Sequence, residues 1–91
     1  MKEDILNQFL LSVSGNPKIL ASHISLFNAI LSFKQKDKRI CNVSRSKLMA
    51  LSKLASTATY HKCLKDLIEF EFIEYRPTYH PNCGSVIKIN L

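Results

Sequence analysis

Two short helices separated by only a few residues are predicted between positions 44 and 70, and this pair constrains the fold more than any other feature of the 91-residue chain. Ser44 and Ser56 each precede a segment with helical hydrophobic spacing. A serine at such a position typically caps a helix by accepting a hydrogen bond from a backbone amide of the first turn. The helices are expected over residues 45–52 and 57–70, with a tight break at residues 53–55. This spacing is typical of a helix-turn-helix.

The spacing of apolar residues predicts which side of each helix is buried. In the first helix of the pair, the residues expected to point inward are Leu48, Met49 and Leu51. When the second helix is wound at about 100° per residue, its core side consists of Tyr60, Leu64, Leu67 and Ile68, with Cys63 and Phe70 at the margin. The opposite side carries Ala58, Thr59, Lys62, Lys65, Asp66 and Glu69, with Thr57 and His61 nearer the boundary. On this outer side hydroxyl and small side chains come first, lysines next and acids last.

Two further helices are predicted before residue 34. The first covers residues 2–14 and ends at Gly15 and Asn16, where a left-handed cap is expected before Pro17. Its apolar face comprises Ile5, Leu6, Phe9, Leu10 and Val13. The second helix runs from about residue 18 or 22 to residue 33, and its face comprises Leu20, Ile24, Phe27, Ile30 and Leu31. A charged loop, "KQKDKR", then follows at residues 34–39.

Three other segments are predicted to be strands. Ile40 to Val43 is too short for a helix and places Cys41 and Val43 on one side. Residues 72–76 and 85–91 are joined by the turn-rich connection 77–84, which indicates a hairpin with a long tip. The order of elements predicts an α+β fold, a winged helix-turn-helix with four helices, a short strand and a C-terminal β-hairpin wing. We expect one domain over residues 1–91, divided into N-terminal helices (1–33), helix-turn-helix (44–70) and wing (72–91).

The positive charge lies in the middle of the chain. The net charge is +6, yet residues 34–65 hold nine Lys or Arg against a single acid, Asp37. Such a basic band favours a polyanionic partner, of which double-stranded DNA is the commonest; an anionic membrane surface and a merely solvated basic surface are the alternatives.

A recognition helix enters the major groove with its amino-terminal part, so the helix at 57–70 is the expected DNA reader. Ser56 and Thr57 are expected to hold a phosphate with the free amides of the helix start, and Thr59 to touch a thymine methyl or base edge. Further contacts to bases or backbone are expected from Arg45, Lys47, Lys53, Lys62 and Lys65, and in the wing from Arg76 and Lys88, with Tyr79 and His80 beside them. The alternative is that the hydroxyls are only caps and the lysines only solvated.

Other classes of site find little support in the sequence. His61 and Cys63 are two positions apart on a helix and point away from each other, so we expect no metal and no cofactor. His23 is expected to be a helix-face residue and Cys63 a small core residue, and an enzyme is not expected. Without a membrane span or a signal segment, a cytoplasmic protein with three reduced cysteines is predicted.

The segments "SKLASTATYHKCLKDL" and "YRPTYHPNCGS" resemble a family of small winged-helix transcriptional regulators associated with mobile genetic elements of gut bacteria. The similarity covers about residues 22–91, including "HISLFNAIL" and "SRSKLMALSKL", and its most specific part is Ala58 to Cys63. It implies DNA binding near the element's own genes, in transcriptional control or in excision and transfer. Two positions depart from the pattern. Glu71 stands where many winged helices have a glycine, so the helix is expected to end differently, and Cys83 replaces a basic or polar wing residue.

Two alternatives concern partners. A winged helix can also serve as a protein-interaction or accessory module in replication, excision or transfer, with the basic band incidental to that role. The apolar face of the 2–14 helix permits a homodimer, as in many winged-helix regulators, or packing against the chain's own core, which we favour slightly.

Overall fold

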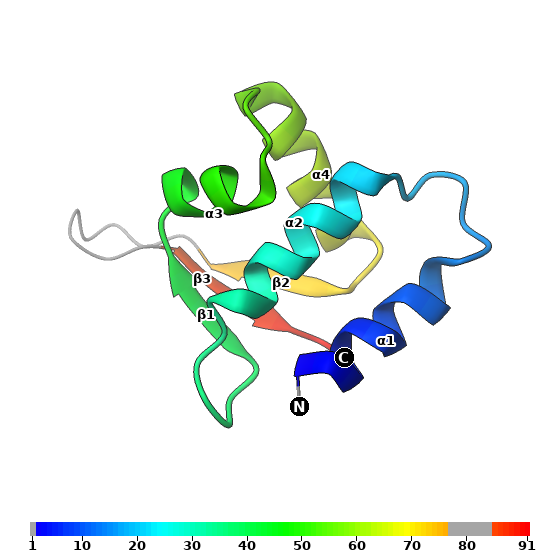
Figure 1. The fold of residues 1–91 in the computed structure, drawn as a ribbon, viewed down its shortest axis with the longest axis horizontal. Helices are drawn as coiled ribbons and strands as arrows, with labels where there is room; N and C mark the ends of the chain where they lie inside the picture. The colour runs from blue at the N-terminus through cyan, green and yellow to red at the C-terminus, as the bar shows by residue number, and fades with distance from the viewer. Residues whose placement is uncertain (1, 77–84) are drawn as a thin grey trace.

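The computed structural model describes residues 2–76 and 85–91, which form an α+β fold of four helices and a three-stranded antiparallel sheet (Figure 1). In chain order these elements are α1 (Lys2–Val13), α2 (Ala21–Ser32), β1 (Ile40–Val43), α3 (Arg45–Ser52), α4 (Thr57–Glu69), β2 (Ile73–Arg76) and β3 (Ser85–Ile89). Each of these helices and strands was predicted as the same type of element, and most predicted boundaries lie within one to three residues of the observed ones. None of the described helices is long and apolar enough to cross a membrane.

Helix α1 packs its apolar face against the rest of the same chain. Ile5, Phe9 and Val13 are buried, and the Phe9 ring stacks on Phe27 of α2 with centroids 4.0 Å apart. The Phe9 ring also meets the edge of Phe72, 5.0 Å away, so α1 covers the junction between α2 and the start of the hairpin. The slightly favoured alternative, packing on the chain's own core, is therefore observed.

The connection between α1 and α2 differs in detail from the prediction. Gly15 and Asn16 do not adopt the left-handed conformation that was expected. Instead, the Asn16 side-chain oxygen accepts a hydrogen bond from the Lys18 backbone amide at 2.9 Å, so a polar side chain closes the turn. Leu10 and Leu20 were expected to face the core, but both are exposed. Leu10 lies beside the buried face of α1, and Leu20 lies before the first turn of α2.

The two serine caps of the helix pair are confirmed. Ser44 Oγ accepts from the Lys47 amide and Ser56 Oγ from the Thr59 amide, each at 3.3 Å. Leu48 is buried as predicted and Met49 is partly buried. Leu51 is wrongly predicted: the residue is 48% exposed, and Ser52 is buried in its place because its hydroxyl donates to the Leu48 carbonyl at 2.6 Å.

Helix α4 buries one side against α2 and the sheet. Its buried residues are Tyr60, Cys63, Leu64 and Leu67. Cys63 thus belongs to the core and not to its margin, whereas Ile68 and Phe70 are exposed at the edge of α4. The buried side of α4 is therefore rotated relative to the predicted one, toward Cys63 and away from Ile68.

The end of α4 corrects another expectation. The Phe72 amide bonds to the Leu67 carbonyl and the Glu71 amide to the Ile68 carbonyl, the pattern of a Schellman cap. Glu71 has φ of 65°, the left-handed conformation for which glycine is preferred. The helix therefore ends in the usual way, with a glutamate held at the strained position.

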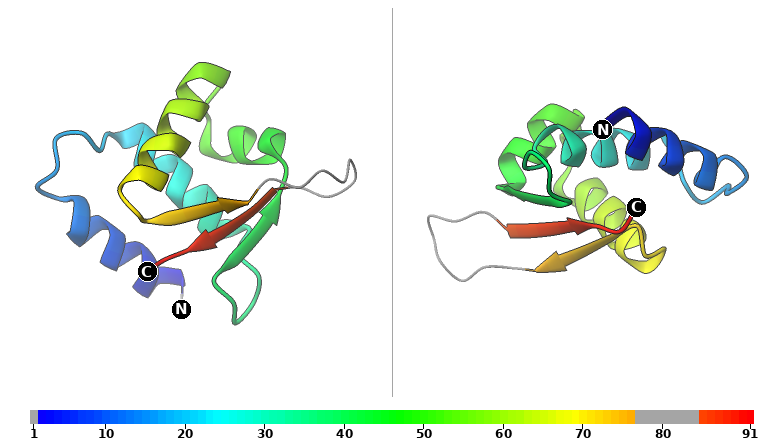
Figure 2. Two further views of the ribbon diagram at one scale, coloured as in Figure 1. Left: turned by 180° about the vertical axis from the view of Figure 1, so that it is seen from behind. Right: turned by 90° about the horizontal axis from the view of Figure 1, so that it is seen from below.

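The sheet has the strand order β1-β3-β2. β2 and β3 form an antiparallel hairpin in which Ile73 pairs with Ile89 and Arg76 with Val86, and β1 adds on the other side of β3. The helices cover one face of the sheet (Figure 2), toward which the strands turn Cys41, Val43, Ile73, Ile87 and Ile89. Tyr79, His80 and Cys83 lie outside the described residues.

Candidate nucleic-acid interface

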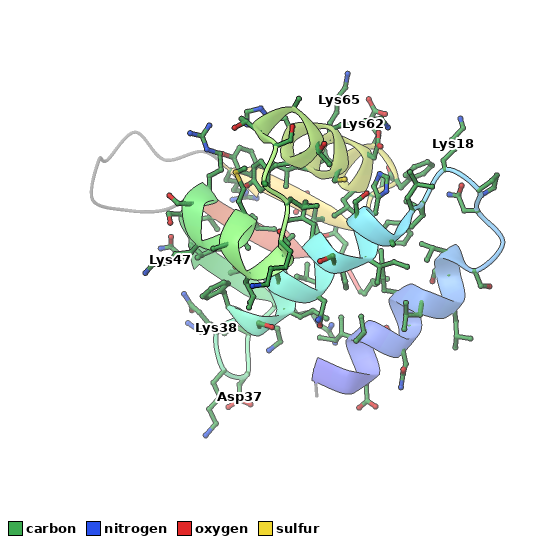
Figure 3. The ribbon with its side chains drawn as sticks, turned by 45° about the horizontal axis from the view of Figure 1, so that its top comes forward. Lys18, Asp37, Lys38, Lys47, Lys62 and Lys65 are labelled. Carbon is green, nitrogen blue, oxygen red and sulfur yellow. The ribbon has the colours of Figure 1, made fainter. Side chains whose placement is uncertain are left out.

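The outer side of α4 is free of the core. Thr57, Thr59, Lys62 and Lys65 are all exposed; Lys62 and Lys65 lie opposite the buried side of the helix, and Thr57 lies nearer its boundary. Lys62 and Lys65 extend outward from α4 (Figure 3). The prediction that Thr59, Lys62 and Lys65 lie on the solvent side of this helix is thus confirmed.

The start of α4 presents backbone donors. The first intrahelical hydrogen bond runs from the Tyr60 amide to the Ser56 carbonyl at 3.0 Å. The amides of Thr57 and Ala58 precede it and point out of the helix start, where a helix carries partial positive charge. Ser56 Oγ is itself occupied by the Thr59 amide, so the serine serves as a cap and the amides remain the donors for an anion.

Both lysines of the outer side have an acidic neighbour one turn later. Lys62 Nζ lies 3.1 Å from Asp66 Oδ2, and Lys65 Nζ lies 3.9 Å from Glu69 Oε1. The lysine side chains are more than two-thirds exposed, and exposed pairs of this kind contribute only about 0.3–0.5 kcal/mol. A phosphate could therefore replace Glu69 as the partner of Lys65 at little cost, whereas Asp66, the partner of Lys62, is only 21% exposed.

A buried histidine holds Asp66, and the sequence analysis missed it. His23 was expected on a helix face, but its side chain is 1% exposed. Its Nδ1 accepts from the Leu20 amide at 3.0 Å, so the proton sits on Nε2, which donates to Asp66 Oδ2 at 2.8 Å. The hydrogen bond from His23, followed by that from Lys62, holds the pKa of Asp66 below its usual value. His23 and Asp66 are 43 positions apart, a separation that leaves no sequence signal.

Helix α3 and the turn supply three exposed cations, Arg45, Lys47 and Lys53. Burial raises the pKa of Tyr60, Tyr75 adds to the rise, and the positive charge of Arg45 opposes it. Lys53 ends α3 in the left-handed conformation, with φ of 64°.

The two hairpin candidates are in different surroundings. Arg76 is exposed at the end of β2, next to the connection 77–84. Lys88 lies farther along β3, opposite Glu74, and its Nζ is 3.6 Å from Glu74 Oε2. The register thus separates Lys88 from the end of the hairpin to which Arg76 belongs.

The basic band of the sequence does not form one surface. The loop at residues 34–39 lies at the end of the molecule opposite the start of α4 (Figure 1), and Lys38 and Lys62 extend from opposite sides (Figure 3). A linear charge count misses this separation because β1 carries the chain from one end to the other. Lys47 of α3 is drawn on the same side as Lys38 (Figure 3), so Lys62 and Lys65 of α4 are the labelled cations that lie away from the loop.

A metal site requires several His, Cys, Asp or Glu side chains around one position. Over residues 2–76 and 85–91 no three His, Cys, Asp or Glu side chains gather around a position where a metal could bind. Cys41 and Cys63 are buried free thiols, and burial raises the pKa of Cys41 to about 11. Cys83 lies outside the described residues.

Comparison with family models, curated proteins and solved structures finds no match for this chain.

Proposed function

We propose that this chain is a winged-helix protein that binds double-stranded DNA, as a transcriptional regulator, with α4 in the major groove. The observation that carries the proposal is the succession of α3, a short turn and α4, followed directly by the antiparallel hairpin β2–β3 with β1 as its third strand. In this arrangement the hairpin is the wing, and a helix of the size of α4 fits the major groove.

The order of charges along α4 favours entry by its first turns. The free backbone amides of the helix start and Thr59 come first, and Lys62 and Lys65 follow. The two acids, Asp66 and Glu69, occupy the last turns. Phosphates beside the helix start would meet amides and lysines before any carboxylate. In the proposed complex the lysines exchange their carboxylate neighbours for DNA.

The remaining candidates have positioning roles in this proposal. Arg45, Lys47 and Lys53 contact the phosphates that flank the groove, and Arg76 contacts the backbone beside the wing. Lys88, paired with Glu74, is the candidate that the proposal uses least.

The test begins with genomic DNA recovered with the protein, which gives a binding site. Thr59→Ala and Lys62→Ala should each weaken binding to this site by about 1 kcal/mol or more, with sequence preference changed more by Thr59→Ala. Lys36→Ala, which removes one exposed charge at the opposite end, is the matched control and should leave affinity for the site unchanged. Unaltered binding by both α4 variants would exclude α4 as the reader.

A second candidate function is a protein-interaction or accessory module, in replication, excision or transfer of a mobile element. It is favoured by a hollow of about 500 Å³ along α3, lined by Ser46, Met49, Ala50, Lys53, Leu54 and Ala55, and by exposed Leu51 on the same helix. Salt separates the two functions. DNA binding weakens steeply as salt rises, because each neutralised phosphate releases counterions, whereas docking of an apolar surface depends on salt weakly.

A further inference from the structure

The loop that joins α2 to β1 has a defined conformation. The Gln35 amide donates to the Ile40 carbonyl at 2.8 Å, and the Lys38 amide to the Gln35 carbonyl at 3.2 Å. The Arg39 carbonyl in turn accepts from the Ile89 amide of β3 at 2.8 Å, and Asp37 takes the left-handed conformation at the tip. These bonds fix the loop to the sheet and direct its side chains into solvent.

The loop carries concentrated and uncompensated positive charge. Lys36, Lys38 and Arg39 are exposed, and Asp37 is the only acid among residues 34–39. Within the described residues, none of these three cations has an ion-pair partner. In contrast, Lys62 and Lys65 of α4 each have a carboxylate within 4.0 Å. A polyanion arriving at the loop would displace no internal partner.

The position of the loop separates it from the proposed reading helix. Figures 1 and 2 show α4 beginning at one end of the molecule and the loop lying at the other. Lys38 and Asp37 point away from the side that carries Lys62 and Lys65 (Figure 3). A duplex seated on the first turns of α4 would therefore leave the loop free.

We propose that this basic loop binds the backbone of a second DNA duplex, so that one molecule joins two duplexes. The inference rests on the proposed function, because α4 must hold the first duplex. Lysine and arginine contacts to phosphates carry no sequence preference, so the second duplex can have any sequence. With Lys36, Lys38 and Arg39 each meeting one phosphate, capture of the second duplex should depend on salt with a log–log slope of roughly −3.

The test measures both binding events with the full chain. A duplex carrying the recovered site is immobilised, the protein is added, and retention of a fluorescent duplex of unrelated sequence is measured over a range of salt concentrations. The loop variant replaces Lys36, Lys38 and Arg39 together with Gln. The matched control replaces Arg45, Lys53 and Lys65 with Gln, which removes the same charge from exposed positions of α3, the turn and α4.

The loop variant should bind the immobilised site as the unaltered protein does but lose most retention of the second duplex, by about tenfold or more. The matched control should instead weaken binding to the first duplex. The inference is overturned if the unaltered protein binds the site yet never retains a second duplex, if the loop variant retains it equally well, or if the loop captures only anionic vesicles or an acidic protein. The proposed function itself fails in a different way, namely if the immobilised site is not bound at all.

Discussion

His23 Nε2 lies 2.8 Å from Asp66 Oδ2, and this contact joins the first turn of α2 to the C-terminal half of α4. The histidine is buried and the carboxylate is 21% exposed, so the bond lies at the boundary between core and solvent. Because Nδ1 is occupied by the Leu20 amide, the Nε2 proton has Asp66 as its partner. A core residue thereby fixes a carboxylate on the outer side of the helix that we propose enters DNA.

Replacing Asp66 with Ala should destabilise the protein by about 1–3 kcal/mol, because the Nε2–H group of His23 would then be buried without an acceptor. Asp66→Asn retains an acceptor oxygen and should cost less. Urea unfolding at neutral pH measures both. The matched control is Glu69→Ala, which removes an acid three positions later that is exposed and pairs only loosely with Lys65. The control should change the free energy of unfolding by no more than about 0.5 kcal/mol, and an equal loss in both alanine variants would contradict the role of the histidine.

Asp66 should also make stability depend on pH. Its pKa in the folded protein lies below its ordinary value of 3.8, because His23 and Lys62 favour the ionised form. The stabilisation from this charge is therefore fully present above the unfolded pKa and is lost as pH falls through the lower, folded pKa. The difference in unfolding free energy between the unaltered protein and Asp66→Asn should be constant near neutrality and shrink below about pH 4. A difference that stays constant in acid would show that the charge of Asp66 contributes nothing.

Glu71→Gly should stabilise the protein by about 0.5–1 kcal/mol, because glycine adopts the left-handed conformation without the steric cost borne by glutamate. The Schellman bonds of Glu71 and Phe72 use backbone atoms and are retained. Thermal or urea unfolding measures the gain. Glu69→Gly removes the same charge from a helical position and should have the opposite sign, losing up to about 1 kcal/mol. Loss of stability in both variants would show that the strain at Glu71 is not significant.

The local features of this fold were predictable because their physical causes are local. Ser44 and Ser56 each accept a hydrogen bond from an amide in the first turn of the helix that they cap, so three or four residues are enough to predict each helix start. Alternation in residues 85–91 determined that Ile87 and Ile89 face the core. The hairpin and the third strand follow from the order of these elements.

The remaining features depend on tertiary contacts. Leu51 is more apolar than Ser52, yet Ser52 is buried, because its hydroxyl bonds to the Leu48 carbonyl and its own carbonyl accepts from Ser25 Oγ of α2. Nothing near His23 in the sequence indicates that Asp66 will be its partner. The charge of residues 34–65 is contiguous along the chain, but β1 divides it between two ends of the molecule. The sequence therefore indicated which cations of α3 and α4 are exposed, but not how the positive charge is distributed over the molecule.

The packing of α1 leads to a last prediction. Phe9 is fully buried between Phe27 and Phe72, so Phe9→Ala should destabilise the protein by about 3–5 kcal/mol through lost burial and a cavity. Leu11→Ala, on the solvent side of the same helix with 78% of the residue exposed, should change stability by no more than about 0.5 kcal/mol. Because the inner face of α1 is buried within its own chain, both effects should be independent of protein concentration in urea unfolding. If Leu11→Ala instead lowered stability in a manner that varied with concentration, α1 would be part of a dimer interface through its outer side, since mass action stabilises an associating chain more as its concentration rises.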